Sequence, residues 1–188
     1  MKIAVVGTTG SGKSTLATHL SRQLNLPWIE LDSFYHLPNW QEESQEVFAE
    51  KITSAMAYGL EVHDGWIVDG NYGSKLGDLV IRDADVVLYF NLSKRIVMYR
   101  IVKRSLQRVL FKEVLWNGNR ERVRNLFKSK PEENVVMWAY TTHSSRKTQL
   151  LSRAKAAPSH QLWIEITRGT KLDELIEQLN RRKALSQY

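Results

Sequence analysis

Three glycines, a lysine and a serine lie together near the start of this 188-residue chain, in the segment GTTGSGKS. The segment fits the pattern G-x-x-x-x-G-K-[ST]. Glycine has no Cβ, so the main chain can turn with positive φ and bring its N–H groups close to phosphate oxygens. The segment therefore predicts a phosphate-binding loop made of Gly7, Thr8, Thr9, Gly10, Ser11, Gly12, Lys13, Ser14 and Thr15.

The two residues that end this pattern have distinct predicted tasks. Lys13 reaches the β- and γ-phosphates of ATP, and the Ser14 hydroxyl completes the shell of a Mg²⁺ ion. The apolar residues 2–6 and the helical pattern at 13–24 add the flanking strand and helix, whose N-terminus favours an anion. A chance match of the four fixed positions has odds on the order of one percent. We therefore favour a phosphate loop over a glycine-rich structural turn.

Two carboxylates follow apolar runs. Asp69 ends the run Trp-Ile-Val, as a Walker B acid does when it faces the water shell of a metal, so Ser14 and Asp69 are the predicted metal residues. Asp32 ends a second run, where an acid could take a proton from an attacking hydroxyl or hold metal-bound water. The alternatives are a turn residue before Gly70 for the first, and an N-cap or Asx-turn residue for the second.

Arginines recur every four residues along the helix expected at 93–110: Arg100, Arg104 and Arg108. The planar guanidinium suits phosphate, and one well-placed arginine contributes about 10³ to 10⁵ in rate to phosphoryl transfer. A solvated basic face is the alternative. We expect the apolar face of this helix to be Ile96, Tyr99, Val102, Leu106 and Val109.

Aromatic residues follow Asp32 in a loop bounded by proline: Phe34, Tyr35, His36 and Trp40. They could stack on a base or a sugar, or they could pack beneath neighbouring helices. Asn71 and Tyr72 pose the same choice after Asp69.

Alternating strand and helix patterns must position these residues. Strands are expected at 2–6, 28–31, 65–69, 85–90 and 161–166, and the longer helices at 13–24, 41–58, 93–110, 132–153 and 171–182. On the second of these helices we expect Val47, Ile52, Met56 and Leu60 to share the buried face. This order predicts an α/β, three-layer P-loop NTPase fold in one domain, 1–188, with a five-stranded parallel sheet. Ligands bind beyond the carboxyl ends of such strands, so we expect one cleft there, with an acceptor region at 33–64 and a basic lid at 111–131.

Composition narrows the function classes. The absence of cysteine excludes thiolate catalysis, disulfides and cysteine-ligated zinc, and no apolar run is long enough for a membrane span or a signal peptide. We therefore expect a cytoplasmic protein without a membrane partner. A net charge of +7 calls for an anionic partner, either nucleotide phosphates or a nucleic-acid backbone.

Four segments together carry a family resemblance: the phosphate loop, WIVDGNY, the Arg100-x-x-x-Arg104 helix and ITRGT. They resemble the adenylate kinase-like branch of the P-loop kinases. DGNY, WNGNRERVRNLF and a W-A-x-x-T-H helix resemble more closely its DNA topology modulation, or adenylate kinase-related, subgroup.

The resemblance implies several roles. Arg100 would lie against the adenine of ATP, Arg104 near its phosphates, and Gly169 in the loop that reads the adenine edge. One of the lid arginines Arg120, Arg122 and Arg124 would close over the transferring group. The implied catalytic set is Lys13, Asp32, Asp69, Arg104 and Arg120.

One departure from the family concerns the phosphoryl acceptor. Adenylate kinases have D-G-x-P-R where this chain has Asp69-Gly70-Asn71-Tyr72, and residues 33–64 contain no arginine. An acceptor without a phosphate therefore has equal weight with AMP. The sequence predicts an ATP-dependent phosphotransferase with a small acceptor. A nucleotide-regulated DNA-binding protein and an ATPase switch without acceptor are the alternatives.

Overall fold

A computed structural model describes residues 1–121, 123–126, 130 and 134–185 of the chain. Its strands form one parallel sheet in the order β2-β3-β1-β4-β5. The strands are β1 (Lys2–Val6), β2 (Trp28–Glu30), β3 (Trp66–Asp69), β4 (Val86–Phe90) and β5 (Leu162–Ile166). The predicted α/β fold with five parallel strands is confirmed.

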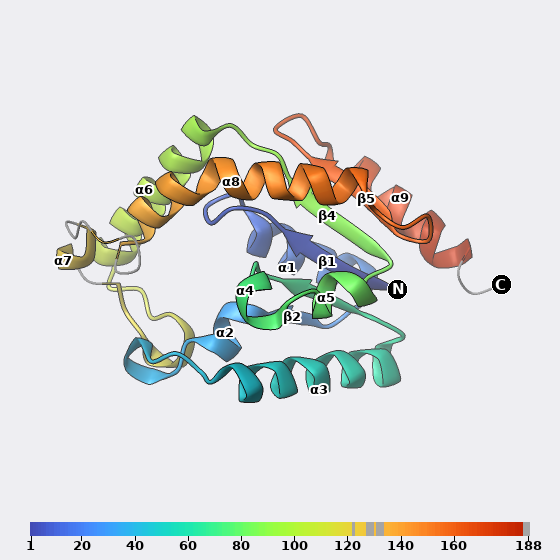
Figure 1. The fold of residues 1–188 in the computed structure, drawn as a ribbon, viewed down its shortest axis with the longest axis horizontal. Coiled ribbons are helices and arrows are strands. Elements are labelled where there is room, and N and C mark those ends of the chain that lie inside the picture. Colours follow the sequence, from blue (N-terminus) through green and yellow to red (C-terminus); the bar gives the residue numbers. More distant parts are fainter. Residues whose placement is uncertain (122, 127–129, 131–133, 186–188) are drawn as a thin grey trace.

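The helices follow the strands in alternation (Figure 1). They are α1 (Lys13–Leu24), α2 (Leu31–Tyr35), α3 (Gln45–His63), α4 (Gly73–Leu76), α5 (Leu79–Asp83), α6 (Lys94–Leu110), α7 (Val123–Leu126), α8 (Val135–Lys155) and α9 (Leu172–Leu185), with 3₁₀ turns η1 (Pro38–Trp40) and η2 (Trp116–Gly118). The first residues of the helix expected at 132–153 lie outside the described part, and α8 begins at Val135. No helix in the described ranges is long and apolar enough to cross a membrane.

Side chains alternate along the strands between two apolar cores, one on each face of the sheet. Ala4 and Val6 of β1 belong to a core with Phe48 of α3 and Leu150 of α8. Ile3 and Val5 belong to the opposite core, with side chains from α1 and α9 such as Leu20 and Leu179. Figure 1 shows α3 and α8 on the near side of the sheet, with α1 behind it. Helices on both faces make three layers, as predicted.

The buried face of α3 differs from the prediction. Ser44 begins the helix as its N-cap, because its Oγ accepts the Val47 N–H at 3.3 Å. Val47 and Leu60, expected in the core, are 38% and 51% exposed. Ile52 and Met56 are buried as predicted, and Phe48 and Gly59 complete the buried face. Gly59 is needed there because a Cβ would lie 3.0 Å from the carbonyl oxygen of Gly65.

The predicted apolar face of α6 is wrong. Tyr99 and Leu106 are 68% and 49% exposed, whereas the buried residues are Val97, Ile101 and Ser105. The helix carries two apolar stripes, and periodicity favoured the outer one. The inner stripe packs on the phosphate loop, where a Cβ on Gly10 would lie 2.8 Å from Ile101 Cγ1.

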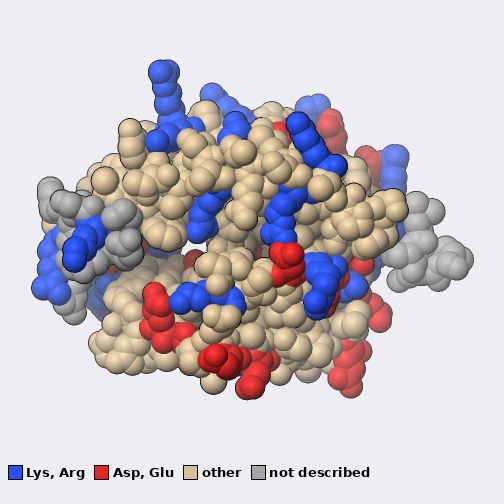
Figure 2. Space-filling model, viewed as in Figure 1, with Lys and Arg blue, Asp and Glu red and all other residues tan. Residues whose placement is uncertain are grey.

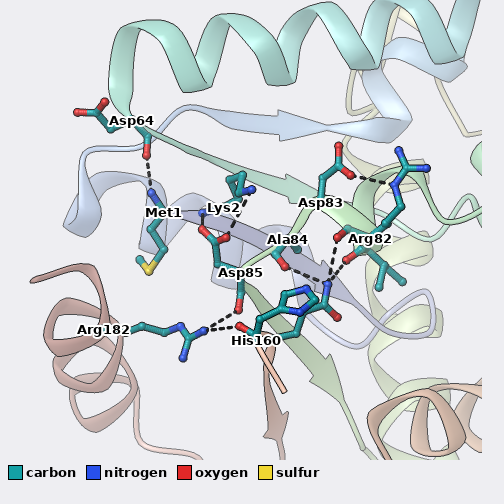
Figure 3. A network of polar contacts seen from close by, with 11 residues as sticks. Met1, Lys2, Asp64, Arg82, Asp83, Ala84, Asp85, His160 and Arg182 are labelled. Atoms are coloured by element: carbon teal, nitrogen blue, oxygen red, sulfur yellow. Dashed lines mark hydrogen bonds and ion pairs between the residues drawn. The ribbon is translucent and has the colours of Figure 1, made fainter. Parts of the chain in front are cut away.

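Polar contacts join the amino-terminal ends of the strands (Figure 3). The Lys2 main-chain N–H donates to Asp85 Oδ2 at 2.8 Å, and the Met1 amino group donates to the Asp64 carbonyl. Arg182 of α9 donates to the carbonyl of His160 at 2.8 Å. These contacts hold the end of the sheet opposite to the phosphate loop.

Candidate functional site

The loop between β1 and α1 has the backbone that its glycines predict. Gly10 and Gly12 have φ of 78° and 103°, in the region that favours glycine, and Gly12 is the left-handed N-cap of α1. A Cβ at Gly7 would lie 2.7 Å from the Cβ of Phe90. Close packing therefore favours glycine at Gly7 and Gly10, and positive φ favours it at Gly10 and Gly12.

Lys13 lies where the loop meets the acidic side of the site. Its Nζ donates to the Thr8 carbonyl at 3.2 Å. Burial lowers the pKa of Lys13, while the nearby carboxylates of Asp69 and Asp32 oppose that change. The ammonium group thus lies between the phosphate loop and two acids, Asp69 at the end of β3 and Asp32 in α2.

Asp69 ends β3 beside β1, paired in register with Val5. It is 2% exposed, and its Oδ2 is buried with no hydrogen-bond partner in the described part of the chain. Burial raises the pKa of Asp69, and the Lys13 charge and the Ser14 hydroxyl oppose the rise. A buried oxygen that lacks a donor is the group that a cation or its water would satisfy.

Ser14 and Asp69 fit a Mg²⁺ site of the kind that nucleotide-binding proteins use. Mg²⁺ usually binds one or two protein oxygens and takes its other ligands from water and phosphate. Among the described residues no group of three His, Cys, Asp or Glu side chains forms a cation cage. A Mg²⁺ ion held there would neutralise charge on phosphate oxygens bound at the loop.

Asp32 lies in the first turn of α2, two residues beyond Glu30, because β2 ends one residue earlier than the strand expected at 28–31. Its Oδ1 accepts a hydrogen bond from the Tyr72 hydroxyl at 2.6 Å, and His36 Nε2 is 3.4 Å from the same hydroxyl. Burial and the Asp32 charge raise the pKa of Tyr72, so the hydroxyl remains a donor. Tyr72 therefore orients the Asp32 carboxylate.

Arg100, Arg104 and Arg108 of α6 line the cavity. Arg100 Nη1 donates to the Ser11 carbonyl at 2.7 Å. Arg104 Nε is buried with no hydrogen-bond partner among the described residues, and burial lowers the pKa of its guanidinium. Arg146 of α8 has its pKa lowered by burial as well. The charges of Arg104 and Arg146 act on Lys13, so both guanidinium groups lie toward the phosphate loop.

A short segment after α6, residues 115–121, lies against the predicted acceptor region; we call it the strap. Asn119 Oδ1 accepts the Trp40 N–H at 2.8 Å, and Asn119 Nδ2 donates to the Leu37 carbonyl at 2.9 Å. Asn117 Nδ2 donates to the His36 carbonyl at 2.6 Å. The described start of the predicted lid is thus a wall of the acceptor region.

The strap also holds the acidic side of the site. Trp116 Nε1 donates to Glu30 Oε2 at 2.7 Å, and Glu121 accepts from Arg108 Nη1 at 2.9 Å. Burial raises the pKa of Glu30, and the Trp116 hydrogen bond opposes the rise.

These groups line one cavity of about 1370 Å³. A pocket for a single ligand usually measures about 300–1,000 Å³, so this cavity has room for a nucleotide and a second molecule. In Figure 2, Lys and Arg side chains gather around the hollow between α8 and α3, and many acidic side chains lie over α3.

Four predicted residues in the described ranges are not brought into the cavity. The Arg120 side chain is exposed, and its carbonyl accepts the Trp40 Nε1–H at 3.1 Å. Gly169 is exposed, and its N–H donates to Thr167 Oγ1 at 3.2 Å. Thr8 is buried outside the lining residues. Arg124 is exposed on α7, and Arg122 lies outside the described residues.

Glu30, Trp116 and Arg146 line the cavity, and sequence reasoning did not select them. Glu30 could have been found from the sequence, because it ends the apolar strand that Asp32 follows by two residues. The other two belong to segments that the sequence marked only as basic, and their approach to the site depends on tertiary packing.

Comparisons with known proteins bear on the fold. No protein-family model and no curated protein matched the chain. An uncharacterized protein from Eubacterium ventriosum is 11% identical, with a TM-score of 0.50 and coverage of 97% of each chain. This chain and the Eubacterium ventriosum protein therefore share a fold. A deoxyadenosine kinase from M. mycoides, solved with dCMP and a flexible dCDP, is 14% identical, with a TM-score of 0.49 and coverage of 98% of this chain and 100% of that chain.

Proposed function

We propose that this chain is an ATP-dependent phosphotransferase that transfers the γ-phosphoryl group of ATP, with Mg²⁺, to a small acceptor carrying a hydroxyl or a phosphate. The observation that carries the proposal is the single cavity lined by Lys13, Asp69 and Asp32. The cavity contains a phosphate loop and also a carboxylate that can accept a proton. A cavity that bound ATP alone would not need this carboxylate.

The proposed reaction is an in-line displacement. The acceptor oxygen bonds to the γ-phosphorus as the bond to the β,γ-bridging oxygen breaks, and ADP leaves. Asp32 takes the acceptor proton, while Lys13 and Arg104 balance the charge on the transferring group. Ser14 and Asp69 hold Mg²⁺, and Arg100 and the turn after β5 flank the adenine.

The test is transfer of label from γ-labelled ATP to a panel of alcohols, nucleosides and nucleoside monophosphates. We expect a labelled acceptor, and we expect Lys13→Ala to reduce its formation by at least about 10³-fold. Lys51→Ala is the matched control, because Lys51 lies on the outer side of α3, paired with Glu43. A rate unchanged in Lys13→Ala contradicts the proposal, and hydrolysis without any labelled acceptor favours the ATPase switch.

A second candidate function is nucleotide-regulated DNA binding, as the name of the DNA topology modulation subgroup implies. The net charge of +7 is compatible with this function. Arg100, Arg104 and Arg146 line the cavity, which favours nucleotide phosphates as the anionic partner. Binding of a fluorescent duplex at 50 and 200 mM salt, with and without ATP, tests it. Tight binding that responds to ATP supports this candidate, and weak binding that ignores ATP removes it.

A further inference from the structure

The two ends of the cavity differ in charge. Lys13, Arg104 and Arg146 gather toward the phosphate loop. At the other end Glu30 and Asp32 line the cavity, and their hydrogen-bond partners are neutral: the Trp116 indole at 2.7 Å and the Tyr72 hydroxyl at 2.6 Å. No lysine or arginine in the described ranges lies within ion-pair distance of either carboxylate.

Arg108 and Lys75 line this end, and both are ion-paired with other carboxylates, although the charge of Arg108 also acts on Glu30. Arg108 lies 2.9 Å from Glu121, and its Nε lies 3.8 Å from Glu113. Lys75 lies 3.5 Å from Glu42. A phosphate monoester bound here would bring about two further negative charges beside Glu30 and Asp32, and burial strengthens such repulsion.

Aromatic rings form the rest of this end: His36, Trp40 and Trp116, which we call the aromatic cluster. The His36 and Trp116 rings stack with centroids 5.7 Å apart and an interplanar angle of 27°, and Trp40 meets Trp116 edge-on at 6.4 Å. All three line the cavity. Burial lowers the pKa of His36, so its ring adds no positive charge at neutral pH. The cluster offers flat apolar surface to a ligand.

We infer that the acceptor is a neutral alcohol that carries a flat heterocyclic ring, as a nucleoside does, and that molecules already phosphorylated are excluded. The inference rests on the proposed phosphotransferase and names the substrate class of the same site. The ring packs against the aromatic cluster, and the carboxylates of Glu30 and Asp32 accept hydrogen bonds from sugar hydroxyls.

The charge arrangement also orients the transfer. The acceptor hydroxyl lies at Asp32, which takes the proton as the new oxygen–phosphorus bond forms. Arg104 and Arg146 stay at the phosphate end, where negative charge moves onto ADP as the β,γ-bridging bond breaks. Glu30 touches the acceptor and not the transferred group, so it is a specificity-determining residue.

The first experiment compares nucleosides with their own 5′-monophosphates as acceptors, with ATP and Mg²⁺. We expect kcat/KM to favour the best nucleoside over its monophosphate by at least 100-fold. Equal or better use of the monophosphate overturns the inference and leaves the phosphotransferase standing. No Lys13-dependent transfer to any acceptor removes the proposed function and the inference with it.

The second experiment changes the charge of the acceptor end. Glu30→Gln is expected to shift the nucleoside-to-monophosphate ratio of kcat/KM at least tenfold toward the monophosphate, whereas Glu61→Gln on exposed α3 surface leaves the ratio unchanged. A role of Glu30 in folding alone would lower both activities together and keep the ratio, which would overturn the assignment of Glu30.

A binding measurement does not depend on turnover. Nucleosides are expected to quench tryptophan fluorescence in Lys13→Ala as in the parent chain. Trp116→Phe should remove most of this quenching, and Trp163→Phe, outside the lining residues, should keep it. Quenching by monophosphates but not by nucleosides overturns the inference.

Discussion

The Trp116 indole donates a hydrogen bond to the Glu30 carboxylate at 2.7 Å, across 86 residues of sequence. The contact joins the strap to the end of β2. Removing the donor leaves a partly buried carboxylate without its partner, which costs about 1–3 kcal/mol. We expect Trp116→Phe to lower the midpoint of thermal unfolding by several degrees, since about 1 kcal/mol corresponds to about 2–4 °C at this chain length.

A double-mutant cycle isolates this contact. Trp116→Phe, Glu30→Met and the double variant are compared by urea unfolding, and a coupling free energy of about 1 kcal/mol is expected. Strictly additive effects would mean that the hydrogen bond contributes nothing to stability.

Asp32 is expected to matter for the transfer step more than for ATP binding. Asp32→Asn keeps the shape of the side chain and removes the proton acceptor, so kcat should fall by about 10²- to 10⁴-fold while KM for ATP changes little. Tyr72→Phe should lower kcat less, because it removes only the hydroxyl that orients Asp32. Steady-state kinetics on the best acceptor test both, and equal losses in the two variants would contradict the division of roles.

We expect the buried charge of Arg104 to lower the stability of the folded chain and to raise the rate of transfer. Its guanidinium is buried, and no described carboxylate lies within ion-pair distance of it. Arg104→Met removes the charge and keeps most of the side-chain length, so we expect a gain of about 1 kcal/mol together with a loss of about 10³-fold in transfer. Arg95→Met, on the exposed side of α6, is the matched control for both measurements. Loss of stability in Arg104→Met would show that the charge is satisfied in the folded chain.

Because His36 is partly buried, we expect the folded chain to lose stability at acidic pH. Burial lowers the pKa of His36 below its ordinary value of 6.5, so the unfolded chain binds the proton more readily. Stability should therefore fall as the pH drops below about 6.5, until the folded-state pKa is passed. His36→Gln should flatten this slope between pH 5 and 7 in urea unfolding, whereas a change at exposed His160 should leave the slope in place.

The sequence was sufficient where the determinant is local. The phosphate loop could be predicted because its pattern is contiguous in sequence, and Gly10 and Gly12 adopt positive φ within the loop itself. Asp69 was found for the same reason, since strand and acid are contiguous. The parallel sheet followed from apolar strands alternating with helices.

Other features depend on contacts between residues far apart in the chain and could not be predicted from the sequence. The face of α6 was misassigned because two apolar stripes compete, and only contact with Gly10 selects the one containing Ile101. Glu30 and Trp116 carry no motif, and their roles come from a contact between segments far apart in the chain. Arg146 reaches the cavity because α8 packs against α6.

The strap makes two distant stretches of the chain interdependent. Side chains of residues 116–119 bind main-chain carbonyls and a carboxylate of residues 30–37, so each stretch fixes the shape of the other. A chimera that imports only one stretch from a relative would lose the complementary partners, and it should fold poorly or accept nothing. Transplanting acceptor preference between such proteins therefore requires both stretches to be exchanged as a pair, and natural divergence in preference would leave matched substitutions in the two.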